Sequence, residues 1–208
     1  MTYLRLFAVA VCAVAATAGV SNAQFTLIPN GDFAAGNTGW GDGASPGTVV
    51  TYETTGGAGG AADGYGRIDN TAGAWGGVLV GDGNGGYPLA SLGLTAGQSV
   101  TIQWDMIELG STGASNAGIK MESFDANGLI NDSGDQIFTT TDSWSTFTYS
   151  YAIDPNATRI QFVPLNVGNN FDFGYDNVGF IASAIPEPSS LALIGLGLTG
   201  VVARRRRS

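Results

Sequence analysis

The chain has 208 residues, 33 glycines, one cysteine and no histidine, and its net charge is −9. Without histidine, Ser-His-Asp and Cys-His nucleophile systems and histidine-ligated zinc are excluded. The charge is concentrated between residues 24 and 185, where Arg67, Lys120 and Arg159 are the only cations against sixteen acids, a net charge of −13. A domain with this charge repels nucleic acid, so we expect no nucleic-acid partner.

An apolar stretch near the start predicts a signal peptide at residues 1–23. One arginine and an apolar core at residues 6–20 are followed by small residues up to Ala23, as signal peptidase requires. Cleavage between Ala23 and Gln24 would also remove Cys12, so the mature chain would contain no cysteine. Such a domain cannot use disulfides, and its core or bound ions must hold it together.

Residues 185–208 combine three features in a fixed order. They are a proline-acid-proline motif, an apolar run and a cationic cluster: Pro186, Glu187 and Pro188; residues 191–203; and Arg204, Arg205, Arg206 and Arg207. The apolar run is shorter than the roughly 20 residues that cross a bilayer core comfortably. Because the adjacent cations resist translocation, we expect a stop-transfer segment that holds the chain transiently in the inner membrane.

This order resembles the PEP-CTERM sorting signal of exported bacterial proteins, which a membrane-embedded exosortase processes. The resemblance implies that Pro186, Glu187 and Pro188 are recognition residues and that the chain is cut near them. It also implies that exosortase and signal peptidase act on the chain during export, and that its destination is the cell surface or an extracellular biofilm matrix. The alternative is an ordinary C-terminal membrane anchor that is never cut.

Glycines and small polar residues divide the middle of the chain into short segments in which apolar and polar residues alternate. Alternation with period two predicts β-strands that each turn one face towards a core. The predicted strands are residues 48–53, 75–80, 100–106, 117–124, 146–151, 158–163 and 175–181. Roughly ten short strands without a helical period predict an all-β domain at residues 24–184, built as a two-sheet antiparallel jelly-roll sandwich.

The segment Asp125-Ala126-Asn127-Gly128 predicts a hairpin after the strand at residues 117–124, because Asn-Gly favours a tight reversal. A calcium loop is the alternative, since five Asp and Asn side chains lie between residues 125 and 135. An EF-hand needs an oxygen ligand at the fifth position and glycine at the sixth. Leu129 and Ile130 occupy those positions, which favours the hairpin.

The domain also resembles galactose-binding-like and carbohydrate-binding-module jelly rolls. The resemblance is carried by the opening Asn-Gly-Asp-Phe to Trp of residues 30–40, by residues 124–128 and 144–162, and by Tyr-Asp-Asn-Val-Gly-Phe at 175–180. In many such proteins the opening phenylalanine precedes a glutamate that helps to bind structural calcium, but here that residue is Ala34. A calcium site would therefore depend on Asp32, Asp176 and backbone carbonyls. Alternatively, Asp176 only begins the last strand.

The resemblance implies a sugar-binding protein that associates with extracellular polysaccharide. Such modules stack sugar rings on exposed aromatic side chains. Trp75 and Tyr87 are the candidates, because glycines surround both, although core packing is the alternative for each. Trp40, Trp104 and Trp144 have positions typical of core or strand-edge anchors.

Two other functions are open. A surface or coat protein without a specific glycan ligand is compatible with every feature above. A glycoside hydrolase would need two carboxylates about 5 to 9 Å apart, and Asp105 with Glu108 or Asp132 with Asp135 are only close in sequence. We therefore expect a protein that is not an enzyme and that has no cofactor except, as an open alternative, structural calcium.

Overall fold

The computed structural model describes residues 24–44, 48–70, 77–81, 85–110, 117–168 and 171–182, with only the backbone at 42–44 and 77–81. Gln24–Ser183 forms a compact unit with its own core. The predicted signal peptide and sorting tail lie outside the described residues and stay predictions as structures. Within the described ranges no helix is both long and apolar enough to span a membrane.

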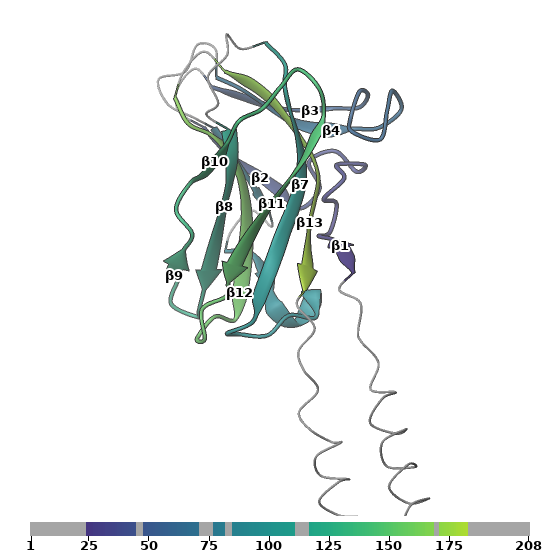
Figure 1. Ribbon diagram of the computed structural model, residues 1–208. Helices are drawn as coiled ribbons and strands as arrows, with labels where there is room; N and C mark the ends of the chain where they lie inside the picture. The colour runs from purple at the N-terminus through teal and green to yellow at the C-terminus, as the bar shows by residue number, and fades with distance from the viewer. Residues whose placement is uncertain are drawn as a thin grey trace, which may run out of the picture. The chain divides into compact units, whose positions relative to one another are not determined.

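The described part of the chain contains thirteen strands and one short 3-10 helix (Figure 1). They are β1 (Phe25–Leu27), β2 (Trp40–Ala44), β3 (Val49–Glu53), β4 (Tyr65–Asp69), β5 (Gly77–Gly81), β6 (Tyr87–Pro88), η1 (Leu89–Leu92), β7 (Ser99–Glu108), β8 (Ala117–Phe124), β9 (Leu129–Asp132), β10 (Gln136–Phe138), β11 (Ser145–Ala152), β12 (Arg159–Asn166) and β13 (Asp172–Ala182).

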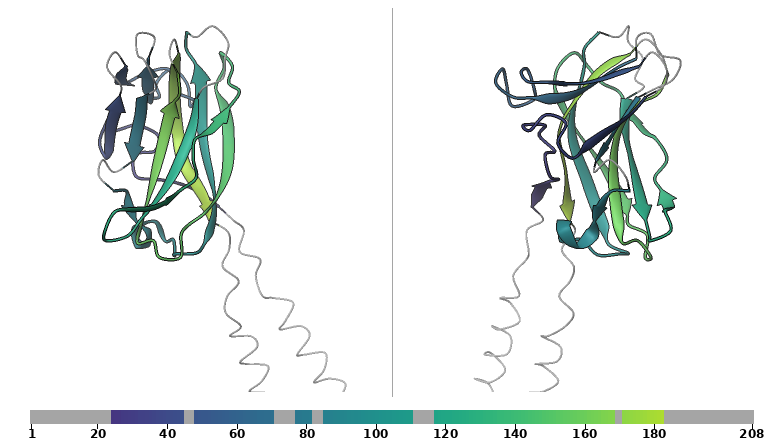
Figure 2. Two further views of the ribbon diagram at one scale, coloured as in Figure 1. Left: turned by 90° about the vertical axis from the view of Figure 1, so that its left-hand side faces the viewer. Right: turned by 180° about the vertical axis from the view of Figure 1, so that it is seen from behind.

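The strands form two antiparallel sheets that face each other (Figure 2). Sheet A has the order β11-β7-β13-β4-β3, with β1 added to β13. Sheet B has the order β10-β8-β12-β5-β2, with β6 added to β12 and β9 to β8. The predicted two-sheet sandwich is confirmed, and each of the seven predicted strands overlaps an observed one.

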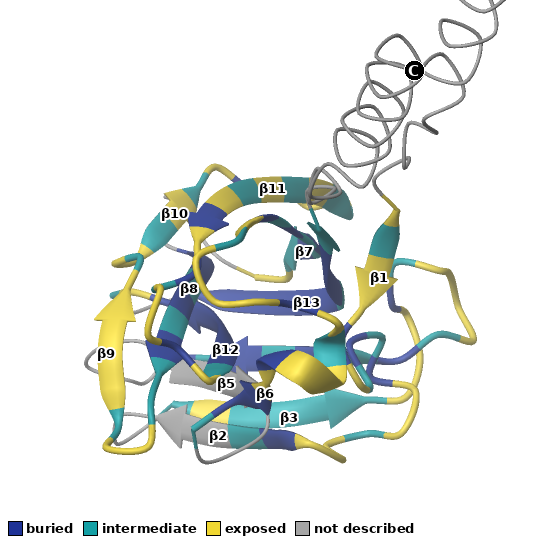
Figure 3. Cartoon of the chain, turned by 90° about the horizontal axis from the view of Figure 1, so that it is seen from below, coloured by how far each residue is buried: buried dark blue, intermediate teal, exposed yellow. Residues whose placement is uncertain are grey.

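The core lies between the sheets and follows the predicted alternation (Figure 3). The alternate residues of β7 that face inward are Val100, Ile102, Trp104 and Met106, and each is at most 1% exposed. Tyr175 of β13 lies in the same core, and its hydroxyl donates to the carbonyl oxygen of Leu165 on β12 at 2.6 Å. This bond joins the two sheets and satisfies a polar group that would be costly to bury alone.

A β-bulge in β13 attaches the N-terminal segment to sheet A. The pairing with β7 shifts by one residue between Asp176 and Gly179, where Asn177 has a φ of 49°. Val178 then turns its backbone away from β7: its N–H donates to Gly31 O at 2.8 Å, and its carbonyl accepts from Ile28 N at 3.2 Å. These two bonds extend the pairing of β13 with β1 beyond Leu27 and fix residues 28–31 at the bulge.

The predicted hairpin after β8 is confirmed. β8 and β9 pair antiparallel, with Phe124 opposite Leu129, and Gly128 has a φ of 132°. Asp125 Oδ1 accepts from the N–H groups of Asn127 at 2.6 Å and Gly128 at 3.1 Å, and these bonds lower the pKa of the Asp125 carboxyl. The carboxylate thus stabilises the turn itself, which favours the hairpin over a calcium loop.

Replacing Gly31 by alanine should destabilise the domain. The new methyl group would lie 2.1 Å from the carbonyl oxygen of Val178, which cannot move without breaking the bonds of the bulge. We expect the free energy of unfolding to fall by about 2 kcal/mol or more. In the control Gly110→Ala, the nearest atom is 3.8 Å away, and the change should stay within about 0.5 kcal/mol in the same denaturant titration. Equal effects of the two substitutions would contradict the proposed role of the bulge.

Candidate functional site

Of the two aromatic residues proposed to stack sugars, Trp75 lies outside the described residues, and Tyr87 is buried. The Tyr87 side chain is 7% exposed, and its hydroxyl donates to Pro29 O at 3.3 Å. Gly86 does not open this region, because a methyl group there would lie 2.3 Å from Ile160 O. The glycine instead allows β6 to approach β12 closely. The expectation that glycines leave Tyr87 exposed is therefore wrong, and its ring is an anchor between sheet B and the N-terminal segment.

The three tryptophans predicted to be anchors differ in their surroundings. Trp40 and Trp104 are core residues, 6% and 0% exposed, and Trp40 stacks on Phe33 with ring centroids 4.7 Å apart. Trp144 is only partly buried and directly precedes β11. Its indole N–H donates to Gly56 O at 3.0 Å, so the ring lies over the loop between β3 and β4.

Trp144 and Tyr65 form an aromatic pair on the outer face of sheet A. Their rings meet edge to face with centroids 5.4 Å apart, and both residues are partly exposed. The pair covers Gly174 of β13, where a methyl group would lie 2.9 Å from Tyr65 Cδ2 and 3.0 Å from Trp144 Cη2. Gly174 faces outward because its neighbours Phe173 and Tyr175 face the core. The glycine therefore leaves room for both aromatic side chains to pack against the sheet.

Arg67 lies beside this pair, since it is opposite Gly174 in the register of β4 and β13. Its guanidinium donates to both carboxylate oxygens of Asp172, at 2.8 and 2.6 Å, and ion pairs with Glu53 at 3.7 Å and Asp69 at 3.5 Å. The bond to Asp172 is the main reason that the pKa of Arg67 is raised. Burial, followed by the charge of Glu53, raises the pKa of Tyr65. Three acids against one cation leave this face negative.

All three cations between residues 24 and 185 have partners. Besides Arg67, Lys120 Nζ lies 2.6 Å from Glu122 Oε1, and Arg159 Nε donates to Gly86 O at 2.9 Å. A polyanion such as nucleic acid or a uronic-acid polymer would have to displace these bonds before it could bind a cation.

Asp176 is a fully buried carboxylate beneath the loop between β3 and β4. Its Oδ2 accepts from Ala58 N at 2.8 Å, and its Oδ1 accepts from Asn177 N at 2.7 Å. Burial raises the pKa of Asp176 to about 7, and the nearby Asp63 contributes to the rise. Asp63 Oδ2 in turn accepts from Gly59 N at 2.7 Å. The glycine-rich segment from 56 to 60 is thus fastened to sheet A by Asp176 and braced within its own loop by Asp63.

Three oxygen atoms meet beside Gly57. A methyl group on this glycine would lie 2.4 Å from Gly64 O, 2.7 Å from Asp176 Oδ2 and 2.9 Å from Asp63 Oδ2. Two carboxylates and a carbonyl around one point are hard donors that suit calcium. Asp32, the residue proposed with Asp176, makes a local turn instead, in which its Oδ1 accepts from Ala34 N at 3.3 Å. No group of three or more Asp, Glu, Cys or His residues arranged to hold a metal occurs in the described ranges.

Asp105 and Glu108, the first pair considered for glycoside hydrolysis, have structural partners. Asp105 faces outward on β7, where it accepts from Thr146 Oγ1 at 2.5 Å and from Asn177 Nδ2 at 2.8 Å. Glu108 lies three residues further along β7, an odd number of steps from Asp105, and it accepts from Thr140 Oγ1 at 3.2 Å. Strand geometry therefore turns these two side chains to opposite faces of sheet A.

Residues 184–207 match the PEP-CTERM protein-sorting motif. The chain carries this sorting motif. It implies exosortase-dependent export and a surface or extracellular location, and it contains the predicted recognition residues Pro186, Glu187 and Pro188 and the cluster Arg204–Arg207. A comparison with curated protein sequences found no match.

Solved structures support the fold of the domain that precedes the sorting motif. The N-terminal CBM22-1–CBM22-2 tandem domain of Xyn10C from Paenibacillus barcinonensis is similar with a TM-score of 0.53 and 17% identity, over 83% of this chain and 49% of that one. A family 16 carbohydrate binding module has a TM-score of 0.50 and 18% identity, over 75% of this chain and 99% of that one. The enzymatically active domain of tailspike protein 4 from bacteriophage CBA120 has a TM-score of 0.55 and 10% identity, over 75% of this chain and 21% of that one.

These likenesses establish a jelly-roll fold of the carbohydrate-binding-module type. This chain spans only about half of the tandem domain and about a fifth of the tailspike domain. The site residues that sequence reasoning missed are Tyr65, Arg67 and Asp63. Tyr65 and Arg67 become apparent through Trp144 and Asp172, which are distant in sequence, and Asp63 through its proximity to Asp176. Gly174 between two core aromatics was a local signal of a covered outer face.

Proposed function

We propose that the protein associates with extracellular polysaccharide after export, through the aromatic pair Tyr65 and Trp144 on sheet A, and that it is not an enzyme. The pair is the observation that carries the proposal. Two partly exposed rings offer apolar surface to a sugar ring, while the partly exposed carboxylates of Glu53 and Asp69 can accept bonds from its hydroxyl groups. The carbohydrate-binding-module fold supports this function without establishing it.

The charges favour a neutral polysaccharide. Glu53, Asp69 and Asp172 outnumber Arg67 beside the pair, and the domain as a whole carries −13. A polymer of uronic acids would meet like charge here at short range. Neutral sugars have no such cost, and their paired hydroxyl groups match the two oxygens of a carboxylate.

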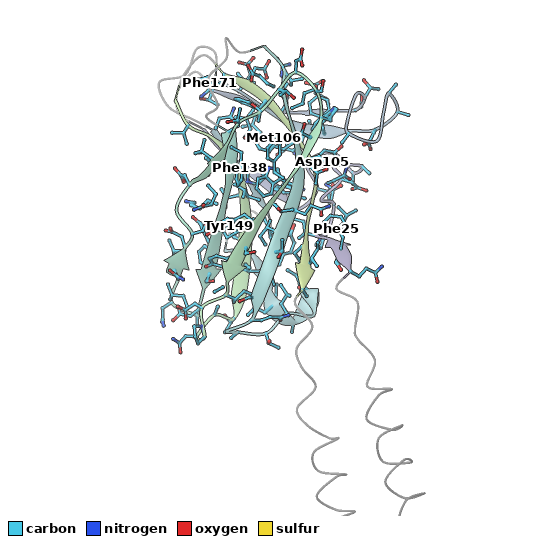
Figure 4. The ribbon with its side chains drawn as sticks, in the orientation of Figure 1. Phe25, Asp105, Met106, Phe138, Tyr149 and Phe171 are labelled. Carbon is cyan, nitrogen blue, oxygen red and sulfur yellow. The ribbon has the colours of Figure 1, made fainter. Side chains whose placement is uncertain are left out.

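Replacing Trp144 by alanine should weaken retention of the domain on a neutral polysaccharide column at least about tenfold, because a central aromatic contact is lost. Phe25→Ala is the matched control. Phe25 also covers an outward glycine of β13, with Phe25 Cε2 2.6 Å from where a Gly179 methyl would lie, but it is on β1 (Figure 4), whereas Arg67 is on β4. This variant should keep wild-type retention, and the eluted glycan should keep its length. Equal losses in both variants, or shortened glycan, would contradict the proposal.

We also propose a structural calcium ion held by Asp63, Asp176 and nearby backbone carbonyls. A cation at this position would offset two adjacent carboxylates, one of which is fully buried. It would also join the loop between β3 and β4 to the bulge of β13. The site differs from the predicted one in using Asp63 in place of Asp32.

In chelator, the free energy of unfolding should fall as the pH rises from 5 to 8. The folded-state pKa of Asp176 is about 7, above its unfolded value, so the folded state holds a proton that it loses over this interval. The loss approaches about 4 kcal/mol between the two pKa values. Saturating calcium favours the charged form of Asp176 and should therefore remove this pH dependence. Asp176→Asn should also remove it, and in this variant calcium should no longer change the free energy of unfolding. Asp125→Asn, at an exposed turn, should leave both effects intact. A calcium-independent slope would refute the calcium site but leave the glycan proposal untouched.

The route to the surface is the remaining part of the proposal. Signal peptidase cuts after Ala23, the tail holds the chain transiently in the inner membrane, and exosortase cuts near Pro186. The mass of protein extracted from the native surface should therefore lack Arg204–Arg207. Replacing Pro186, Glu187 and Pro188 by alanine should keep the arginines on the chain, whereas the same number of alanines at 189–191 should not. An arginine tail on the wild-type surface protein would show an uncut membrane anchor.

A further inference from the structure

β11 is an open edge of sheet A. One side of β11 pairs with β7. On the other side of β11, the described part of the chain provides no paired strand (Figure 3). An edge strand presents unpaired N–H and C=O groups and is a template for another strand. At eight residues, β11 is longer than the other edge strands, which have two to five.

The register identifies which backbone groups are free. Ile153 N donates to Gln98 O, in the same register that pairs β11 with β7, so the odd-numbered residues of β11 exchange hydrogen bonds with β7. The even-numbered residues then point their backbone N–H and C=O groups outward. They are Thr146, Thr148, Ser150 and Ala152, all of them exposed, and no backbone partner is found for them within the described residues.

β11 also lacks the charged side chains that prevent edge strands of two molecules from pairing. From residue 143 to residue 153 the chain has no charged residue, no proline and no glycine. The other long edge strands carry acids, at Asp42 in β2, Glu53 in β3 and Asp132 in β9. In a domain of net charge −13, two copies repel each other at most surfaces, but within Ser145–Ala152 two paired β11 strands bring no acids opposite one another. The nearest acids along the chain, Asp142 and Asp154, lie beyond the two ends of the strand.

We propose that the protein forms a two-fold dimer in which β11 pairs antiparallel with β11 of a second copy, with Thr148 near the axis. The outward N–H and C=O groups of each strand match those of the other, because the strand is its own partner under the two-fold. Thr146 and Thr148 would meet Ser150 and Thr148 of the second copy as polar cross-strand pairs on the outer face. The partly buried rings of Phe147 and Tyr149 would be covered at the joined edge.

Sedimentation of the compact domain, residues 24–183, in chelator and without glycan tests the dimer over about 10 µM to 1 mM. The wild type should sediment as a monomer–dimer equilibrium. Thr148→Pro removes one outward N–H and no ladder bond, so it should weaken dimerisation at least tenfold while the monomer keeps its melting temperature. A wild type that stays monomeric throughout this range would overturn the proposal.

Charge exchange at Thr148 tests the register. Thr148→Lys and Thr148→Glu each place like charges opposite one another across the axis, so each variant alone should be monomeric. An equimolar mixture should restore the dimer. Thr51→Lys, on the opposite edge of sheet A, makes the same charge change and should dimerise like the wild type. Dimerisation of each Thr148 variant alone, or assembly lost in Thr51→Lys, would place the interface elsewhere.

Discussion

The bulge in β13 is the feature on which the arrangement of this domain depends. One extra residue at Asn177–Val178 lets a strand in the middle of sheet A bind three separate parts of the chain. Val178 holds the N-terminal segment, Asn177 Nδ2 donates to Asp105 on β7 at 2.8 Å, and the Asp176 carboxylate holds the loop between β3 and β4. These three attachments fall on three consecutive residues of β13, Asp176 to Val178.

The N-terminal segment is shaped to meet the bulge. Asn30 and Phe33 have left-handed φ values of 54° and 51°, a conformation that asparagine tolerates and that phenylalanine adopts only under constraint. The Asn30 side chain supplies that constraint: its Nδ2 donates to Gly36 O and Thr38 O, and its Oδ1 accepts from Ala35 N. The resulting compact turn brings Phe33 onto Trp40 and presents Gly31 to Val178. The opening motif of the domain and its last strand are thus one structural unit.

Long, regular strands are predictable from the sequence, whereas short strands that depend on pairing with a distant segment are not. β7, β8 and β11 were predicted because a half-buried strand turns every second side chain inward, and six or more residues are enough to show that period. β1, β6 and β10 have two or three residues, too few to show a period, and exist because a longer strand pairs with them. The same limit explains the site residues. Nothing local distinguishes Asp63 from the other acids, and the glycine beside Tyr87 indicated close packing rather than an open surface.

The negative charge of the domain and the uncharged edge strand β11 together suit a surface protein that must avoid non-specific aggregation. Acids on the other edge strands of four or more residues limit strand pairing to β11. Because β11 is the one uncharged edge of that length among the described strands, pairing closes after two copies. The axis of an antiparallel pair is perpendicular to the sheet, so both outer faces would point the same way. Trp144 directly precedes β11, and a dimer would therefore present two aromatic pairs on one face. Two weak contacts on the same polymer bind with a combined strength that neither has alone, which is the condition that a repetitive polysaccharide meets.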